Sequence, residues 1–116
     1  MDSEVIPVGD KEGFISFCEQ LDPEIITILL KTAQRSLPEH IDKLRHALDR
    51  SDPTLIYEAA HSIKGECGSM FATRISEIAA VAETECKDIN FIRNLMPEIE
   101  DAAFHTLNWW QTQNVE

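Results

Sequence analysis

The residues best placed to do chemistry are a histidine and two glycines on one predicted helix, residues 53 to about 69. Apolar side chains on this helix centre on Ile63, which marks the core face of a helical wheel at about 100° per residue. His61, Gly65 and Gly68 then lie at about 140–160° from Ile63, on the opposite face. The spacing therefore predicts a solvent-facing imidazole with glycine on the turns that follow it.

A lysine completes this constellation. Lys64 follows His61 by three positions, so its ammonium can lie beside the imidazole. Glycine in an exposed helix interior costs about 1 kcal/mol relative to alanine, and a bare exposed face gives the monomer nothing in return. It does let another protein approach the imidazole closely. The pattern favours an exposed nucleophile, a nearby cation and clear access for a macromolecular partner.

Other interpretations stay open on these residues alone. A surface histidine three residues from a lysine often arises by chance. Gly65 could give room to a neighbouring helix, and Gly68 could be an early helix C-cap. The residue pattern alone does not choose among them.

The elements that must position this face are expected to be helical throughout, because apolar residues recur at steps of three and four and alternating strand-type runs are missing. Asp10 is expected to cap a short helix that reaches about Leu21. A long helix should begin at Asp22-Pro23, with a kink or a break at Pro38. Ser51-Asp52-Pro53 is expected to end this helix and to begin the next one.

Two further helices should follow the histidine helix. One carries an apolar stripe over 71–86, and the other runs over 92–110 with a bend at Pro97. Lys87 to Asn90 should form the short connection between them. Short connections between long amphipathic helices make neighbours antiparallel. We therefore expect an all-α chain: an antiparallel up-down four-helix bundle with an additional short N-terminal helix, preceded by an extended lead-in over 1–10.

The composition of the chain limits the classes of partner that it is expected to bind. The chain has 116 residues, which suits one domain over 1–116, and its net charge of -11 argues against nucleic acid and against an acidic membrane surface. No apolar run is long enough for a signal peptide or a membrane span. Cys18, Cys67 and Cys86 are too widely spaced for a thiol pair and are expected to be free in a reducing compartment, so we expect a cytoplasmic protein.

A metal site is not expected. The four histidines do not form a ligand motif: His40 and His46 are six residues apart, and neither His61 nor His105 has a second ligand nearby in the sequence. We expect the other three histidines to lie at the surface or its boundary, and Cys67 to be a packing thiol on the core face.

The segment at residues 60–65, AHSIKG, together with Gly68, closely resembles the signature of the histidine-containing phosphotransfer (HPt) family. That signature is a small residue, His, any residue, an aliphatic, Lys, Gly and, three further on, Gly or another small residue. It fixes five positions within nine residues, and the family's helical bundle fits the whole chain. The chain resembles a stand-alone bacterial-type HPt protein of two-component phosphorelays.

The resemblance implies roles residue by residue. His61 is the phosphoryl acceptor, Lys64 compensates charge, and Gly65 and Gly68 clear the approach. Glu83 matches a frequent Glu/Gln position whose role here stays open. The residues around the histidine are expected to form the surface on which a partner docks, namely Tyr57, Glu58, Gly65, Gly68, Ser69 and Ala72. The chain departs from the family at Phe71, where many members have glycine, which leaves the far end of the docking face uncertain.

The function that the resemblance implies is a phosphocarrier. The receiver domain of a hybrid sensor histidine kinase would bring a phosphorylated aspartate and Mg²⁺ to His61. The receiver domain of a response regulator would then accept the phosphoryl group from His61. We expect no cofactor of the chain's own and no ATP-binding or autokinase machinery, since no nucleotide-binding glycine motif is present. A monomer is the default. A docking-only module and an enzyme with His61 as general base are the competing hypotheses, the latter disfavoured because the wheel places His61 on a convex face.

Overall fold

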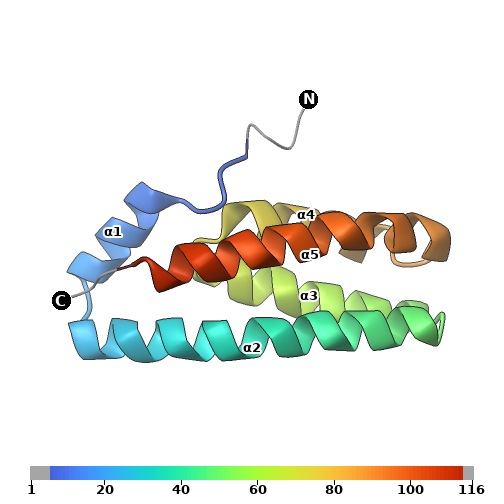
Figure 1. Ribbon diagram of the computed structural model, residues 1–116, viewed down its shortest axis with the longest axis horizontal. Helices are drawn as coiled ribbons and strands as arrows, with labels where there is room; N and C mark the ends of the chain where they lie inside the picture. The colour runs from blue at the N-terminus through green and yellow to red at the C-terminus, as the bar shows by residue number, and fades with distance from the viewer. Residues whose placement is uncertain (1–5, 114–116) are drawn as a thin grey trace.

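The computed structural model describes residues 6–113, and this part of the chain is all-helical (Figure 1). The helices are α1 (Lys11–Glu19), α2 (Pro23–Asp49), α3 (Pro53–Ser69), α4 (Thr73–Thr84) and α5 (Ile89–Gln111). The predicted fold class is confirmed, and the predicted histidine helix has the expected bounds.

Helices α2 to α5 form the bundle, and α1 lies across one end of it (Figure 1). Along the bundle α2 packs against α3, α3 against α4 and α4 against α5, and α5 closes the ring by packing against α2. The face made by α3 and α4 is therefore opposite the face made by α2 and α5. This arrangement decides which side of the molecule a residue on α3 can present.

A continuous apolar core fills the bundle, because each long helix buries one stripe of side chains. The largest fully buried side chain is Trp110 at the end of α5. Its indole N–H donates a hydrogen bond of 3.1 Å to the backbone oxygen of Met70, which follows α3. This bond ties the end of α5 to the end of the histidine helix and satisfies the one polar group of a buried indole.

Both internal prolines lie within continuous helices, so of the kink or break expected at Pro38 the break is absent, while the kink there and the bend at Pro97 stay predictions. Helix α2 runs through Pro38, and α5 runs through Pro97. A proline removes one backbone hydrogen bond from a helix, yet Leu37 and Ile41 are buried on either side of Pro38. The apolar stripe along α2 keeps the helix continuous, because its burial outweighs the loss of one bond.

Two predicted boundaries are also wrong by a few residues. The first helix ends at Glu19 rather than near Leu21. The connection between α4 and α5 covers residues 85–88 rather than 87–90, because the Asp88 side chain accepts a bond from the Phe91 amide and so caps α5 earlier.

The segment before α1 is held against the start of α4. The amide of Asp10 donates to the oxygen of Phe71 at 2.8 Å, and the Arg74 guanidinium donates to the oxygen of Ile6 at 3.0 Å. The Asp10 carboxylate then caps α1 by accepting from the Gly13 amide, as expected from the sequence. Of the predicted lead-in, residues 1–5 lie outside the described residues. No helix within residues 6–113 has the length and apolar character needed to cross a membrane.

Candidate functional site

The histidine helix starts at a strong local signal. The Asp52 carboxylate accepts from the amides of Thr54 and Leu55, at 3.0 and 3.3 Å, and Pro53 occupies the first helical position. The core face of α3, which includes Ile63 and Cys67, is fully buried. The start and the buried face together fix the rotation of the helix, and this rotation turns His61 outward.

His61 is exposed, as predicted, and it has a partner on the next helix. Its side chain is 59% exposed, and its ring Nδ1 lies 2.6 Å from Oε2 of Glu83 on α4. Glu83 is itself only 12% exposed, so its carboxylate is held between the two helices. The imidazole is therefore anchored on one nitrogen and open to solvent on the rest of its ring.

The same carboxylate also holds the lysine. Lys64 Nζ donates to Oε1 of Glu83 at 2.6 Å, so one carboxylate joins His61 and Lys64. The hydrogen bond from Lys64, and then that from His61, lower the pKa of Glu83 below its usual value. Glu83 is ionised at neutral pH and can only accept hydrogen bonds. Nδ1 of His61 must carry the proton, and in the neutral ring Nε2 is the free nitrogen.

Tyr57 packs against the imidazole from one turn earlier on α3. The two rings are stacked, with centroids 5.7 Å apart and planes 11° from parallel. Tyr57 and Glu83 therefore limit the rotation of the His61 ring from two sides. The ring of Tyr57 is also exposed, and its role in docking a partner stays a prediction.

The two glycines differ in their surroundings. A Cβ on Gly65 would meet no other atom within 4 Å, so this position is open space and does not make room for a neighbouring helix. A Cβ on Gly68 would lie 3.2 Å from Oγ of Ser76, whose hydroxyl donates to the backbone oxygen of Lys64. Gly68 also lies inside α3 rather than at its cap, which is Met70. Gly65 therefore has no packing role within the bundle, whereas Gly68 lies close to Ser76 of α4; the predicted role of both glycines in clearing the approach stays a prediction.

Of the remaining residues predicted for docking, Glu58 and Ser69 are exposed. Ala72 is not: its side chain is fully buried, so its prediction as a surface residue is wrong. The amide of Ala72 donates to the oxygen of Cys67 at 2.8 Å, a bond that closes the turn between α3 and α4. This turn draws Ala72 under the helices, where it presents nothing to a partner.

The role of Glu83 is the main feature of the site that the sequence left open. Residues 61 and 83 are on different helices, and only the packing of α3 against α4 brings them together. A signal was present in the match to a Glu/Gln position of the family, but a match of residue type does not give a hydrogen-bond partner.

The other candidate side chains lie away from this cluster. Cys67 is fully buried, and burial raises the pKa of its thiol, which suits the predicted packing role. His40 lies at a boundary, 3.5 Å from a carboxylate oxygen of Glu66 across the α2/α3 contact. Burial raises the pKa of Glu66. Within residues 6–113 no group of three or more His, Cys, Asp or Glu side chains is placed to hold a metal ion.

Comparison with known proteins places this fold and site in a class. The family model described as Hpt domain matches residues 28–108, which is more than half of the chain and includes α3 and α4 entirely. The chain belongs to the Hpt domain family.

The fold agrees with a solved structure. The crystal structure of histidine-containing phosphotransfer protein B (HptB) from Pseudomonas aeruginosa PAO1 superposes with a TM-score of 0.81, covering 90% of this chain and 92% of that one at 22% identity. A likeness at this identity concerns the fold. No curated protein matches the chain.

Proposed function

We propose that the chain is a phosphocarrier that accepts a phosphoryl group on Nε2 of His61 from the phosphoaspartate of a receiver domain and passes it to a second receiver. The observation that carries this proposal is the shared carboxylate of Glu83, which binds Nδ1 of His61 and the ammonium of Lys64 at 2.6 Å each. Membership of the Hpt domain family supports the same chemistry.

The transfer step needs one free lone pair and little covalent assistance. Nε2 attacks the phosphorus in line, the N–P bond forms, and the P–O bond to the partner's aspartate breaks. The aspartyl carboxylate leaves with the electron pair of that bond. The ring keeps its proton on Nδ1 and gains a positive charge, which the adjacent Glu83 carboxylate offsets.

Charge on the transferring phosphoryl oxygens needs separate compensation. Lys64 supplies a cation held one turn from His61, and the partner supplies the rest with its Mg²⁺. The donor in this proposal is the receiver of a hybrid sensor kinase, and the acceptor is the receiver of a response regulator. The chain brings no cofactor of its own, and transfer is reversible because the same nitrogen serves both partners.

The test is transfer of label from a phosphorylated receiver domain in the presence of Mg²⁺. Several receivers are tried with the wild type and with His61→Ala. We expect label on the wild type that is lost in acid and survives alkali, as a phosphoramidate does, and none on His61→Ala. An aspartyl phosphate has the opposite lability. Label on His61→Ala would show that a residue other than His61 accepts the phosphoryl group.

A docking module without phosphorylation is the alternative outcome of the same experiment. It would follow if no receiver labelled the chain while one bound the wild type and His61→Ala equally well. The paired His61 and Glu83 also have the arrangement of a general base and its orienting carboxylate. A groove between α2 and α3 is lined by Glu58 and Ser62 but not by His61, so catalysis by a concave site gains no support from it.

A further inference from the structure

A groove between α2 and α3 lies beside the candidate acceptor and was not predicted from the sequence. Its volume is about 400 Å³, and its residues come from both helices: Asp42, Lys43, His46, Leu55, Glu58, Ala59 and Ser62. Ser62 directly follows His61 in α3, and Glu58 lies one turn before it. A protein that covers the imidazole from this side therefore covers the groove as well.

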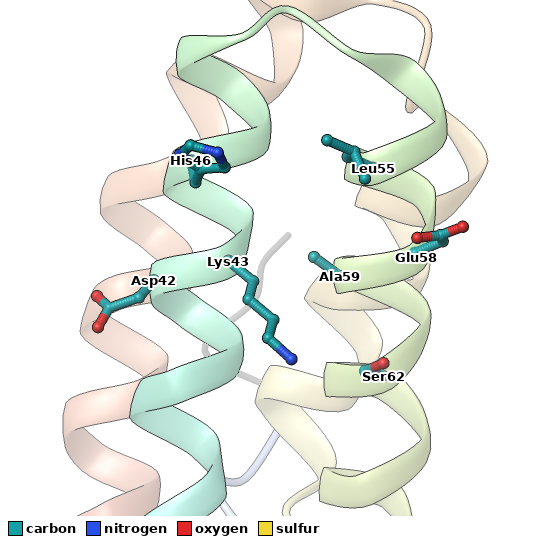
Figure 2. Close-up of a pocket in the computed structure, with 7 residues that line it drawn as sticks. All are labelled: Asp42, Lys43, His46, Leu55, Glu58, Ala59 and Ser62. Carbon is teal, nitrogen blue, oxygen red and sulfur yellow. The ribbon is translucent and has the colours of Figure 1, made fainter.

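The groove has an apolar wall and one inward-facing lysine. Figure 2 shows Leu55 and Ala59 of α3 directed toward α2, and the Lys43 side chain extending from α2 across the gap toward α3. Lys43 takes part in none of the ion pairs found among residues 6–113. Its ammonium is thus available to a charge that enters the groove from outside.

The carboxylates at the edge of the groove do not compete for this ammonium. Asp42 points away from α3 in Figure 2, and its carboxylate pairs with Arg45, which also binds Glu100 of α5 at 2.8 Å. Glu58 points away from α2. The charged group turned into the groove is the lysine, on a chain whose net charge is -11. The groove therefore complements an acidic group with apolar neighbours rather than a basic one.

We infer that this groove seats an acidic side chain of the receiver domain, flanked by apolar residues, and that Lys43 selects among receivers by pairing with it. The inference rests on the proposed function, because it names the chemistry by which the partner of His61 is recognised. A second copy of the chain is a poor occupant, since two bodies of charge -11 repel each other.

The experiment compares Lys43→Met and Lys43→Glu with a matched control, Lys31→Met. Lys31 is an exposed lysine of the same helix, twelve residues before the groove lysine. The probe is the receiver domain that labels the wild type fastest. We expect Lys43→Met to raise the KM for the phosphorylated receiver about tenfold with kcat unchanged, as loss of one charge-assisted contact does. Lys43→Glu should raise it further, and Lys31→Met should match the wild type.

Two more readouts separate an ion pair from a merely structural role. Added salt should weaken receiver binding to the wild type more than to Lys43→Met. Changing acidic residues on the receiver one at a time to lysine should restore binding to Lys43→Glu at a single position. Equal KM values within twofold for all three variants would overturn the inference while leaving transfer to His61 intact.

Binding of the unphosphorylated receiver keeps the inference testable if transfer fails. If no label appears but a receiver binds, a tenfold higher Kd for Lys43→Met still supports the groove as its seat, and an unchanged Kd overturns it. If no receiver labels or binds the chain, the proposed function and the inference both fall. Saturable shifts of groove resonances on adding acetate or phosphate alone, with receiver binding insensitive to Lys43, would assign the groove to a small anion and overturn the inference.

Discussion

At the scale of single residues, the site depends on a carboxylate that touches no substrate in the proposed reaction. Glu83 fixes the tautomer of His61 and holds Lys64 through its two oxygens. Glu83→Ala should therefore lower the rate of transfer about tenfold at saturating receiver, because Nε2 is then protonated in part of the neutral rings. The measurement is single-turnover transfer from a phosphorylated receiver.

The conservative change separates orientation from charge. Glu83→Gln keeps an oxygen that accepts from Nδ1, so it should retain more transfer than Glu83→Ala. Glu77→Gln, at an exposed position of the same helix, is the control and should leave the rate unchanged. Equal rates for Glu83→Ala and wild type would show that the carboxylate does not position the acceptor.

The ionisation of Glu83 has a consequence for stability. Its pKa is lower in the folded chain than the ordinary 4.5, because Lys64 and His61 donate hydrogen bonds to it. The stabilisation of the folded chain by ionised Glu83 is therefore fully present above the ordinary pKa. It is lost as the pH falls through the lowered pKa of the folded chain.

We expect wild type to exceed Glu83→Gln in free energy of unfolding at pH 7, and the difference to shrink as pH falls below 4.5. Urea unfolding of both proteins across this range measures it. The raised pKa of Glu66 acts in the opposite direction, but it is common to both proteins and cancels in the difference. A difference that grows in acid would contradict the assignment.

At the scale of the helix, Gly65 and Gly68 predict a conflict between stability and function. A Cβ at Gly65 meets nothing, so Gly65→Ala should stabilise α3 by up to about 1 kcal/mol while slowing transfer, because the added methyl stands in the partner's path. Thermal unfolding and transfer kinetics on the same sample test both effects.

Gly68→Ala is the matched comparison. Its Cβ would lie 3.2 Å from Oγ of Ser76, so this hydroxyl, which donates to the Lys64 oxygen, must move slightly and the gain in stability should be smaller than at Gly65. If both variants were stabilised equally and transferred at the wild-type rate, neither glycine would be needed for access.

Features that depend on interactions between residues close in the sequence could be predicted, whereas features that depend on contacts between different helices could not. The bounds of α3 depend on Asp52, Pro53 and a local apolar period, so they were predicted correctly. The contact of His61 with Glu83 joins residues on two helices, and their relative rotation and height depend on side-chain packing, which no local pattern encodes. The same holds for Lys43, which extends from α2 into the groove between α2 and α3 (Figure 2) and belongs to no motif.

Local rules also failed where packing overrides them. Pro38 predicts a kink or a break by its chemistry, yet the buried stripe of α2 holds the helix continuous through it. Phe71 adopts φ of 66°, a left-handed conformation that disfavours any residue but glycine. The resemblance to the family leads us to expect glycine here, and a left-handed backbone is the conformation that favours glycine. The sequence shows that Phe71 departs from the family pattern, but it does not show what the phenylalanine side chain contacts.

At the scale of the whole molecule, two aromatic residues tie α1 to the bundle: Trp109 of α5, whose ring lies 5.9 Å from that of Phe14, and Phe71. The ring of Phe71 lies 6.0 Å from that of Phe14 and 5.2 Å from that of Phe17, both on α1. Its backbone oxygen accepts from the Asp10 amide. The chain therefore accepts backbone strain of about 1–2 kcal/mol at the end of the histidine helix and gains an aromatic anchor for its N-terminal helix.

Two substitutions separate the strain from the anchor. Phe71→Ala keeps the strained backbone and loses the ring, so it should lower the free energy of unfolding by about 2–3 kcal/mol. Phe71→Gly loses the same ring but relieves the strain, so its loss should be about 1 kcal/mol. Amide hydrogen exchange should quicken more across residues 11–19 than in α3 in both variants, because exchange in the core helix α3 can rise only by as much as the global free energy of unfolding falls. Transfer to His61 should then persist at the wild-type rate, since the histidine, Lys64 and Glu83 are held by the packing of α3 against α4. Unchanged exchange in α1 would mean that the backbone bond from Asp10 and the contact of Phe14 with Trp109 hold the N-terminal helix without the ring, and the strain at Phe71 would be left without a compensating contact.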